Sequence, residues 1–332
     1  MSDVLRFLRT QGVLVALTLL IFFGGWRYDH FLGIFNIVTF LRYNSMFALI
    51  ALGMCFVIMT GGIDLSVGST AAMSSVIAAY LSPYGLLPGL AGGAAAGLAV
   101  GVLNGILITR LNILPFIATL ASMLAASGTG LLAAGNESIG VSYDSGFTAI
   151  GQGNILGFPI PAWMAIVAYL IGSLTLNFLS FGRNVLAVGG GEDAARLMGL
   201  PVNRVKFTVY TLSGLMAGLA GVQLAAQFGA GQPTEGVGWE LFAIASVVVG
   251  GTLLTGGVGS VGATLSVKSP ASASGEAHSP ACRNSRRRSK TGSNTATTTP
   301  SHSPGPKAQE KSSPATAAPE KNSLPWPTDV HE

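Results

Sequence analysis

Eight apolar stretches dominate this sequence and limit what it can fold into. A helix needs about 20 mostly apolar residues to cross a bilayer, and several of the stretches approach that length. They cover residues 13–26, 46–60, 67–81, 86–108, 113–134, 160–181, 207–228 and 241–254. A mixed stretch ending near Arg42 separates the first two. We therefore expect an all-α, polytopic transmembrane helical bundle with about eight spans.

The scarcity of charge supports a lipid environment. Charged residues make up 10% of the chain, whereas a soluble domain carries roughly 25%. So few charges could not cover a soluble surface with polar groups. The chain also contains 45 glycines, and small residues are frequent where transmembrane helices pack closely.

The net charge is unevenly distributed. Residues 1–267 hold nine of the 18 basic and nine of the 14 acidic residues, so the remaining nine basic and five acidic residues place the whole net charge of +4 in the tail. The basic balance therefore does not indicate that the body binds nucleic acid. The two cysteines, Cys55 and Cys282, predict neither a disulfide framework nor a zinc site.

Basic loop residues predict the orientation, because they gather on the cytoplasmic side of a membrane protein. Arg6 and Arg9 place the N-terminus in the cytoplasm, before a first span that we interpret as uncleaved rather than as a signal peptide. Counting spans puts a second basic set on the same side: Arg110, Arg183, Arg196, Arg204 and Lys206. The loop 135–159, which has acidic residues and no Lys or Arg, falls outside. Arg27 and Arg42 also fall outside and break the pattern.

The segment GGIDLSVGS at 61–69 places one carboxylate, Asp64, between two apolar stretches. A carboxylate within a membrane protein is costly and is a functional candidate by default, and backbone freed by a broken helix needs partners within the protein. The other reading is local, since Asp64 could cap the helix that follows it. The two readings are compatible.

The segment GRNVLAVGGGEDAARLMGLPVNRVK at 182–206 is the most polar part of the body. Glu192 and Asp193 followed by Arg196 predict a short helix with acids at its start, ended by Gly199 and Pro201. Such a helix could dock into a partner on the cytoplasmic face, or the segment could be an ordinary solvated connector.

Other polar features are less specific. The glycine-rich stretch 250–262 is not directly followed by Lys-Ser or Lys-Thr, so close helix packing or a broken membrane helix fits better than a phosphate cradle. Glu235 and Glu240 flank the start of the eighth stretch, where an outer interfacial location is the simplest expectation. Polar residues within the spans could serve a pathway or bonds between helices: Asn104, Asn112, Thr119, Ser122, Asn177, Ser213 and Gln223.

Four stretches in order resemble the permeases of bacterial ABC importers for monosaccharides, the ribose, arabinose, xylose and galactofuranose group, which is related to the branched-chain amino acid permeases. They are GGIDLSVGS at 61–69, LNILPFIATLASM at 111–123, the segment 182–206 and ELFAIASVVVGGTLLTGGVGSVGATL at 240–265. The resemblance covers most of residues 45–265. It implies a sugar pathway in the bacterial inner membrane that takes its energy from a partner, and the body carries no catalytic constellation or Walker motif of its own.

The resemblance also implies partners and residue roles. A second permease subunit, identical or homologous, would complete the pathway within membrane lipid. A periplasmic sugar-binding protein would deliver the substrate, and a cytoplasmic ABC ATPase would bind the ATP, so this chain needs no cofactor. The implied ATPase-coupling residues are Gly182, Arg183, Gly189, Gly190, Glu192, Ala194, Ala195, Arg196 and Gly199. The broken-helix or pathway candidates are Gly61, Gly62, Asp64, Ser66, Gly68, Asn112, Thr119 and Glu240.

The C-terminal part departs from the family. Members continue with about two further spans, about ten in all, whereas here a Ser/Pro/Arg-rich tail follows Leu265. The expected division is an incomplete permease domain over 1–265 and a disordered tail over 266–332, because the tail has too little apolar surface to offset its ordering entropy. The abrupt change indicates a frameshift or a degenerate gene, and we hypothesise a truncated permease.

Two alternatives come from other classes. A secondary carrier with broken helices would share the glycine-interrupted spans but would work without ATP. A non-transport membrane component would leave sugar uptake unchanged when its gene is deleted.

Overall fold

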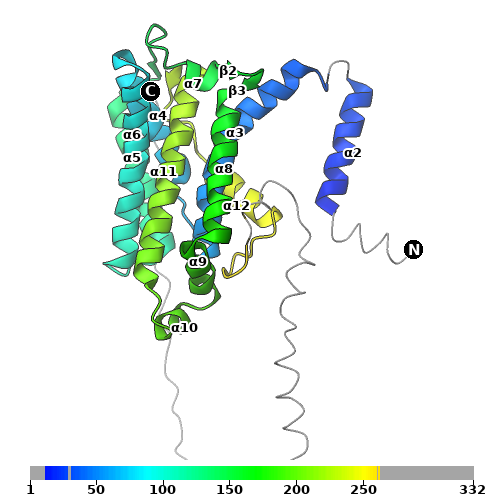
Figure 1. The fold of residues 1–332 in the computed structure, drawn as a ribbon. Helices are drawn as coiled ribbons and strands as arrows, with labels where there is room; N and C mark the ends of the chain where they lie inside the picture. Colours follow the sequence, from blue (N-terminus) through cyan, green and yellow to red (C-terminus); the bar gives the residue numbers. More distant parts are fainter. Residues whose placement is uncertain (1–11, 29–30, 260, 262–332) are drawn as a thin grey trace, which may run out of the picture. The chain divides into compact units, whose positions relative to one another are not determined.

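A computed structural model describes residues 12–28, 31–259 and 261 of the 332-residue chain. These residues are mostly helical, with very little sheet (Figure 1), which confirms the all-α class. The helices are α2 (Gly12–Arg27), α3 (Ile34–Met59), α4 (Val67–Leu81), η1 (Ser82–Tyr84), α5 (Leu86–Thr109), α6 (Pro115–Ala134), α7 (Ala149–Gln152), α8 (Ile160–Phe178), α9 (Ser180–Gly190), α10 (Glu192–Leu197), α11 (Val202–Phe228) and α12 (Trp239–Val249). The strands form two short antiparallel pairs: β1 (Ile139–Gly140) with β4 (Ala230–Gly231), and β2 (Asn154–Ile155) with β3 (Phe158–Pro159).

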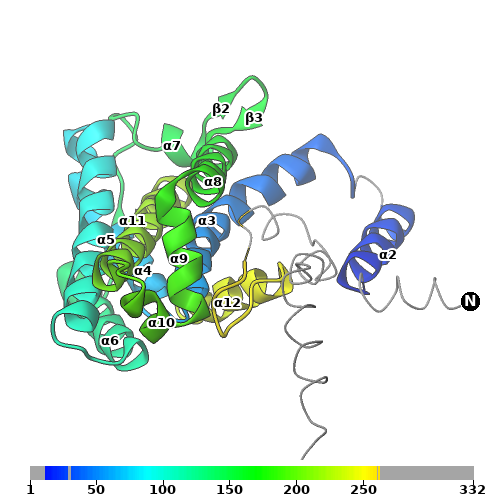
Figure 2. The ribbon, with the colours of Figure 1, turned by 60° about the horizontal axis from the view of Figure 1, so that its bottom comes forward.

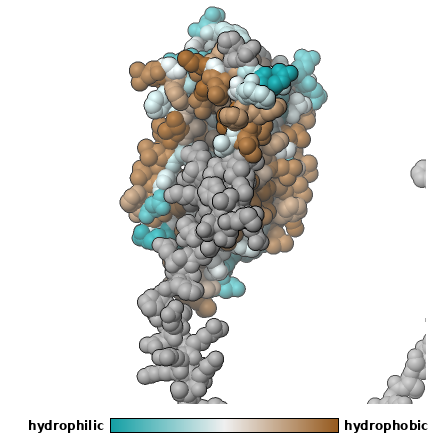
Figure 3. All heavy atoms as spheres, turned by 90° about the vertical axis from the view of Figure 1, so that its right-hand side faces the viewer, coloured by the Kyte–Doolittle hydropathy of each residue, from teal (hydrophilic) through white to brown (hydrophobic). Residues whose placement is uncertain are grey.

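Five of the described helices are long and apolar enough to cross a membrane: α3, α5, α6, α8 and α11. Their outer faces carry exposed apolar side chains, among them Leu103, Phe116 and Leu170. Figure 3 shows one face on which apolar side chains gather along both sides of the body, with hydrophilic ones near its upper and lower ends. The chain is therefore a multi-pass membrane protein.

Several predicted boundaries were wrong. The mixed stretch before residue 46 is helical, so α3 runs unbroken from Ile34. The predicted span 207–228 begins five residues earlier, at Val202. The predicted span 160–181 ends at Phe178, and a separate helix, α9, begins at Ser180. The eighth predicted span is the short helix α12, whose 11 residues measure roughly 16 Å and do not cross a bilayer alone.

Glycines allow a close contact between the antiparallel helices α5 and α11. A Cβ atom on Gly97 would lie 2.4 Å from the Gly214 carbonyl oxygen and from the Gly218 Cα atom, and one on Gly101 would lie 2.6 Å from the Tyr210 carbonyl oxygen. Since any larger residue would force the backbones apart, these glycines let the two helices meet face to face, as small residues do in membranes.

The loop between α6 and α8 covers the end of the bundle opposite α10 (Figure 1). It is anchored by Phe147, which is fully buried against Gly89. Arg42 on α3 donates hydrogen bonds to the Gln152 carbonyl and to Asn154 Oδ1, both at 3.1 Å. These bonds give Arg42, which broke the charge pattern, a structural reason for its position.

Candidate functional site

The chain forms a buried turn around Asp64 between α3 and α4. Asp64 is 1% exposed, and Gly61 takes a φ of 78°, a left-handed conformation that glycine adopts without strain. The hydrogen-bond partner Ser213 is 11 residues (213 − 202) into α11, which corresponds to roughly 16 Å along that helix. The turn therefore lies within the depth of the hydrocarbon core, which is about 30 Å thick.

Hydroxyl groups and one backbone amide surround the Asp64 carboxylate. The backbone N–H and the hydroxyl of Ser66 donate to Oδ1 at 3.0 and 2.7 Å, and the Ser213 hydroxyl donates to Oδ2 at 2.8 Å. Asn104 on α5 donates to the Ser66 hydroxyl oxygen at 2.9 Å. The capping interpretation was wrong, because Ser66 is the N-cap residue of α4, no side chain caps that helix, and Asp64 bonds to Ser66 itself. The Ser213 and Asn104 contacts join the turn to α11 and α5.

Two polar atoms beside this network have no hydrogen-bond partner within the described part of the chain. They are Asn104 Oδ1 and the Tyr210 hydroxyl, both in buried residues. Tyr210 lies against Gly62, where an added Cβ atom would come within 2.3 Å of its hydroxyl. The Asp64 cluster, defined as Asp64, Ser66, Asn104, Tyr210 and Ser213, is therefore polar, buried and not fully satisfied.

Three more predicted residues lie near this cluster. Thr119 on α6 is buried, and its hydroxyl donates to the Pro115 carbonyl at 2.9 Å, with the Ile63 carbonyl at 3.4 Å. Glu240 on α12 is half-buried, with Oε2 3.1 Å from the Cβ position of Gly68 in the first turn of α4. Trp239, at the start of α12, packs against Phe47 of α3 at 4.8 Å between ring centroids. The outer interfacial place expected for Glu240 stays a prediction.

Asn112 does not join the cluster. It is exposed in the connection between α5 and α6 and has a φ of 53°. Asparagine tolerates this left-handed conformation because its short side chain can bond locally. The structure therefore gives Asn112 a role in the turn and no contact with Asp64.

Three glycine-rich segments that are distant in sequence meet at the end of α3. The Gly257 N–H donates to the Met59 carbonyl at 3.0 Å. A Cβ atom on Gly189, near the end of α9, would lie 1.8 Å from that carbonyl oxygen and 2.5 Å from the Gly257 nitrogen. We call this contact of Met59, Gly189 and Gly257 the glycine junction. It places the end of α9 directly against the chain that continues into the Asp64 turn.

The segment 182–206 is more ordered than expected. Its first part is helix α9, which the sequence did not predict, and the short helix predicted from Glu192 is confirmed as α10. Figure 2 shows α9 and α10 at one end of the bundle. A Cβ atom on Gly182 would lie 2.2 Å from the Leu176 carbonyl oxygen, so this glycine permits the sharp change from α8 to α9. Gly199, with a φ of 79°, follows α10.

Glu192 binds two cations at the start of α10. Its carboxylate accepts hydrogen bonds from Arg196 at 2.8 Å and from Lys206 of α11. Partial burial raises the pKa of the Glu192 carboxyl, but the bonds to Lys206 and Arg196 outweigh it, so the pKa lies below its usual range. These contacts fix α10 against the start of α11.

The remaining predicted coupling residues divide by exposure. Ala195 is fully buried, whereas Gly190 has open space around it, Ala194 is exposed, and Arg183 is exposed and donates to Ser180 Oγ at 2.9 Å. The sequence did not single out Leu197 and Met198, which are 90% and 67% exposed at the end of α10. The sequence signal that could have identified them is that they are two adjacent apolar residues within the most polar segment of the body.

Known proteins share this chain's sequence pattern over most of its length. The family described as branched-chain amino acid transport system / permease component matches residues 36–271. A ribose import permease protein of Bacillus subtilis is 44% identical over 257 residues, which are 76% of this chain and 80% of the relative. A ribose import permease protein of Escherichia coli is 38% identical over 263 residues, or 78% of this chain and 82% of the relative.

A third relative has a different named substrate. The L-arabinose transport system permease protein of Escherichia coli is 39% identical over 234 residues, which are 68% of this chain and 71% of the relative. No solved structure matches the chain.

Proposed function

The chain belongs to the branched-chain amino acid transport system / permease component family, and we propose that it is the membrane-spanning permease subunit of an ATP-driven importer for a small sugar. The observation that carries this proposal is the 44% identity to a ribose import permease over four fifths of that relative's length. The relatives named for ribose and arabinose favour a pentose among small sugars.

The proposed partners follow from this role. A cytoplasmic ABC ATPase would bind and hydrolyse ATP, a periplasmic binding protein would deliver the sugar, and a second permease subunit would complete the pathway. We place the chain in the bacterial inner membrane with its N-terminus in the cytoplasm, on the basis of the basic residues at the α10 end. The chemistry of ATP hydrolysis belongs to the ATPase, and this chain supplies the moving pathway.

The arrangement of α9 and α10 supports a route for coupling. In this proposal the exposed residues Leu197 and Met198 contact the ATPase. The bonds from Glu192 to Lys206 transmit its movement to α11, and the glycine junction transmits it through Met59 to the Asp64 turn. The first route reaches the Asp64 cluster because Tyr210 and Ser213 lie on α11. The second reaches it because the chain after Met59 continues into the Asp64 turn.

Uptake of labelled ribose, arabinose, xylose and galactose tests the proposal. A strain without the gene is supplied with this chain, its ATPase and its binding protein. ATP-dependent uptake of one sugar supports the importer. Uptake that survives ATP depletion would favour a secondary carrier instead, and uptake that never depended on the gene would favour a non-transport component.

The expected tail lies outside the described residues and stays a prediction, as do its disorder and the truncation hypothesis. Resequencing the gene beyond the codon for Val267 tests the frameshift. Restoring the reading frame should raise uptake if the present chain is truncated. Full uptake by the unaltered chain would overturn that hypothesis.

A further inference from the structure

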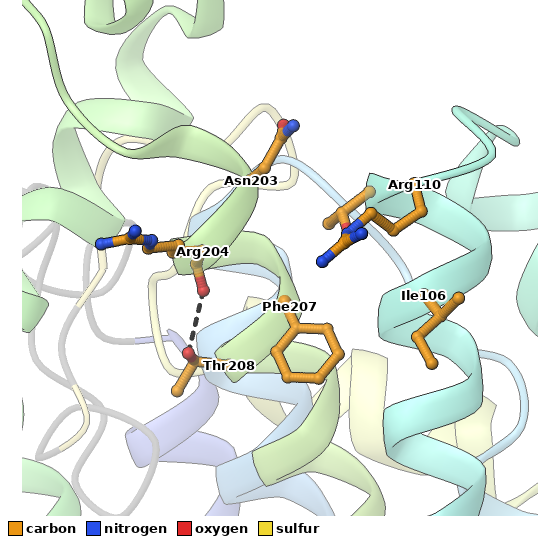
Figure 4. Close-up of a pocket in the computed structure, with 7 residues that line it drawn as sticks. Ile106, Arg110, Asn203, Arg204, Phe207 and Thr208 are labelled. Atoms are coloured by element: carbon orange, nitrogen blue, oxygen red, sulfur yellow. Dashed lines mark hydrogen bonds between the residues drawn. The ribbon is translucent and has the colours of Figure 1, made fainter.

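A cavity of about 590 Å³ opens between the end of α5 and the start of α11. Its lining residues are Ile106, Thr109, Arg110, Asn203, Arg204, Phe207 and Thr208. Figure 4 shows the Arg110 side chain extending into the gap between the two helices, with the Phe207 ring beside it, while Arg204 extends away from Arg110. Arg204 also lines a second cavity of about 400 Å³ with Arg196.

The cavity forms where the close packing of α5 and α11 ends. The two backbones touch at Gly101, but at Gly105 the neighbour is the ring of Phe207, which would lie 2.8 Å from an added Cβ atom. The ring therefore holds the helix ends apart. This opening follows from the packed core and does not depend on a mobile loop.

The cavity changes from polar to apolar along the membrane normal. Helix α5 has 24 residues and measures roughly 36 Å, so it exceeds the hydrocarbon thickness of about 30 Å and brings Arg110 to headgroup level. Ile106 lies one helical turn deeper, roughly 6 Å from Arg110 along the axis. Helix α11 has the same order, with the polar residue Asn203 near the headgroups and the apolar residue Phe207 about one helical turn deeper.

Part of the positive charge at this level is left without a counter-ion among the described residues. Glu192 forms both of the ion pairs there, with Arg196 and Lys206. Among the described residues, the guanidinium groups of Arg110 and Arg204 form no ion pair, and no acidic residue lines the cavity. On the outer face of α5, the side chains of Ile106 and Leu103 are 42% and 47% exposed. The apolar part of the cavity is therefore continuous with a lipid-facing surface.

We propose that this cavity binds an anionic phospholipid, with its phosphate on the Arg110 guanidinium and an acyl chain against Ile106 and Phe207. Basic pockets between transmembrane helices take anionic headgroups for this electrostatic reason. The inference requires only that the chain spans a membrane and does not rest on the proposed sugar transport. A docking segment of an ATPase fits less well, because the cavity's apolar side continues onto the exposed apolar face of α5 at Ile106 and Leu103.

Native mass spectrometry of the detergent-purified full chain tests this proposal with two probes, dioleoylphosphatidylglycerol and dioleoylphosphatidylcholine. The wild-type chain should bind the anionic lipid more tightly. Arg110→Gln should lower its affinity for the anionic lipid about fivefold, since one interfacial arginine contributes about 1 kcal/mol, and should leave the zwitterionic lipid unaffected. Arg110→Lys should retain most of the preference.

The matched control is Arg183→Gln, which removes an exposed arginine of α9 that does not line this cavity. It should keep the wild-type lipid preference. Equal losses in Arg110→Gln and Arg183→Gln would show a diffuse surface effect and overturn the proposal. An unchanged preference of Arg110→Gln for the anionic lipid over the zwitterionic one would also overturn it.

Discussion

Asp64 and Glu192 are both carboxylates beside α11, and they are held in opposite ways. Glu192 is half-exposed at the end of the bundle and binds two cations. Asp64 is buried at membrane depth and accepts hydrogen bonds from Ser66 and Ser213, with no ion pair among the described residues. Water and nearby cations stabilise the first charge. The Asp64 carboxyl has only fixed dipoles as partners among the described residues, so small shifts of α4 or α11 change its environment far more.

The largest expected effect comes from breaking the link between these two regions at the glycine junction. Gly189→Ala places a Cβ atom 1.8 Å from the Met59 carbonyl oxygen, and neither backbone can move freely. We expect the rate of sugar uptake to fall at least tenfold. A tenfold fall corresponds to a loss of about 1.4 kcal/mol in the free energy that couples the ATPase to the pathway. The measurement is the rate of sugar uptake divided by the amount of this chain present in the membrane.

Gly190→Ala is the matched control for that change, because the Cβ position of Gly190 has nothing within 4 Å. The proposed ATPase contact is at Leu197 and Met198, so Gly190→Ala should leave uptake near the wild-type value. Equal activity of the two variants would show that the contact of α9 with Met59 does not matter for transport.

A second prediction concerns the Asp64 cluster itself. Asp64→Ala leaves the Ser66 and Ser213 donors buried without their acceptor, and each such group costs about 1–3 kcal/mol. We expect a clearly lower midpoint of thermal unfolding for the purified chain. Asp64→Asn keeps an acceptor oxygen and should lower it less. A higher midpoint in Asp64→Ala would show that burial of the charge outweighs its hydrogen bonds.

A smaller effect is expected at Glu192. Glu192→Gln keeps the shape of the side chain and weakens both ion pairs, and exposed pairs of this kind are worth about 0.2–1 kcal/mol. The unfolding midpoint should therefore barely change, while faster hydrogen exchange in α10 reports its looser contact with Lys206. A loss as large as that in Asp64→Ala would contradict the contrast between the two carboxylates.

The pH dependence of the Glu192 contacts should be the smallest effect. Because the folded-state pKa of Glu192 is lowered, its contribution is fully present above the unfolded pKa of about 4.3 and is lost as pH falls through the folded pKa. The protection of α10 amides, taken as the ratio of intrinsic to observed exchange rate at each pH, should be unaffected by this carboxyl between pH 6 and 8 and should fall only in acid. In Glu192→Gln this loss of protection in acid should disappear.

The sequence predicted the long helices well, because unbroken apolar stretches such as 86–108 and 113–134 have few other stable states in lipid. It failed where the pattern was mixed. Arg42 and its polar neighbours concealed the first half of α3, and the glycines of 182–190 concealed α9, whose helical state depends on packing against Met59.

The Asp64 cluster could be predicted only in part. Asp64 stood out as a carboxylate between apolar stretches, and Asn104 and Ser213 stood out as polar residues in spans. Their meeting could not be predicted, because it depends on the approach of α5 to α11, set by Gly97 and Gly214. Tyr210 gave no signal at all, since a tyrosine in a membrane span usually packs as an aromatic residue.

Transport by purified components tests the central claim most directly. Proteoliposomes containing this chain and its ATPase, with the binding protein added, are given labelled ribose and ATP, and sugar accumulation is followed beside ATP hydrolysis. Our account predicts accumulation that requires ATP hydrolysis and disappears in Gly189→Ala but not in Gly190→Ala. Accumulation driven by an ion gradient without ATP would contradict the assignment of this chain as an ATP-driven sugar permease.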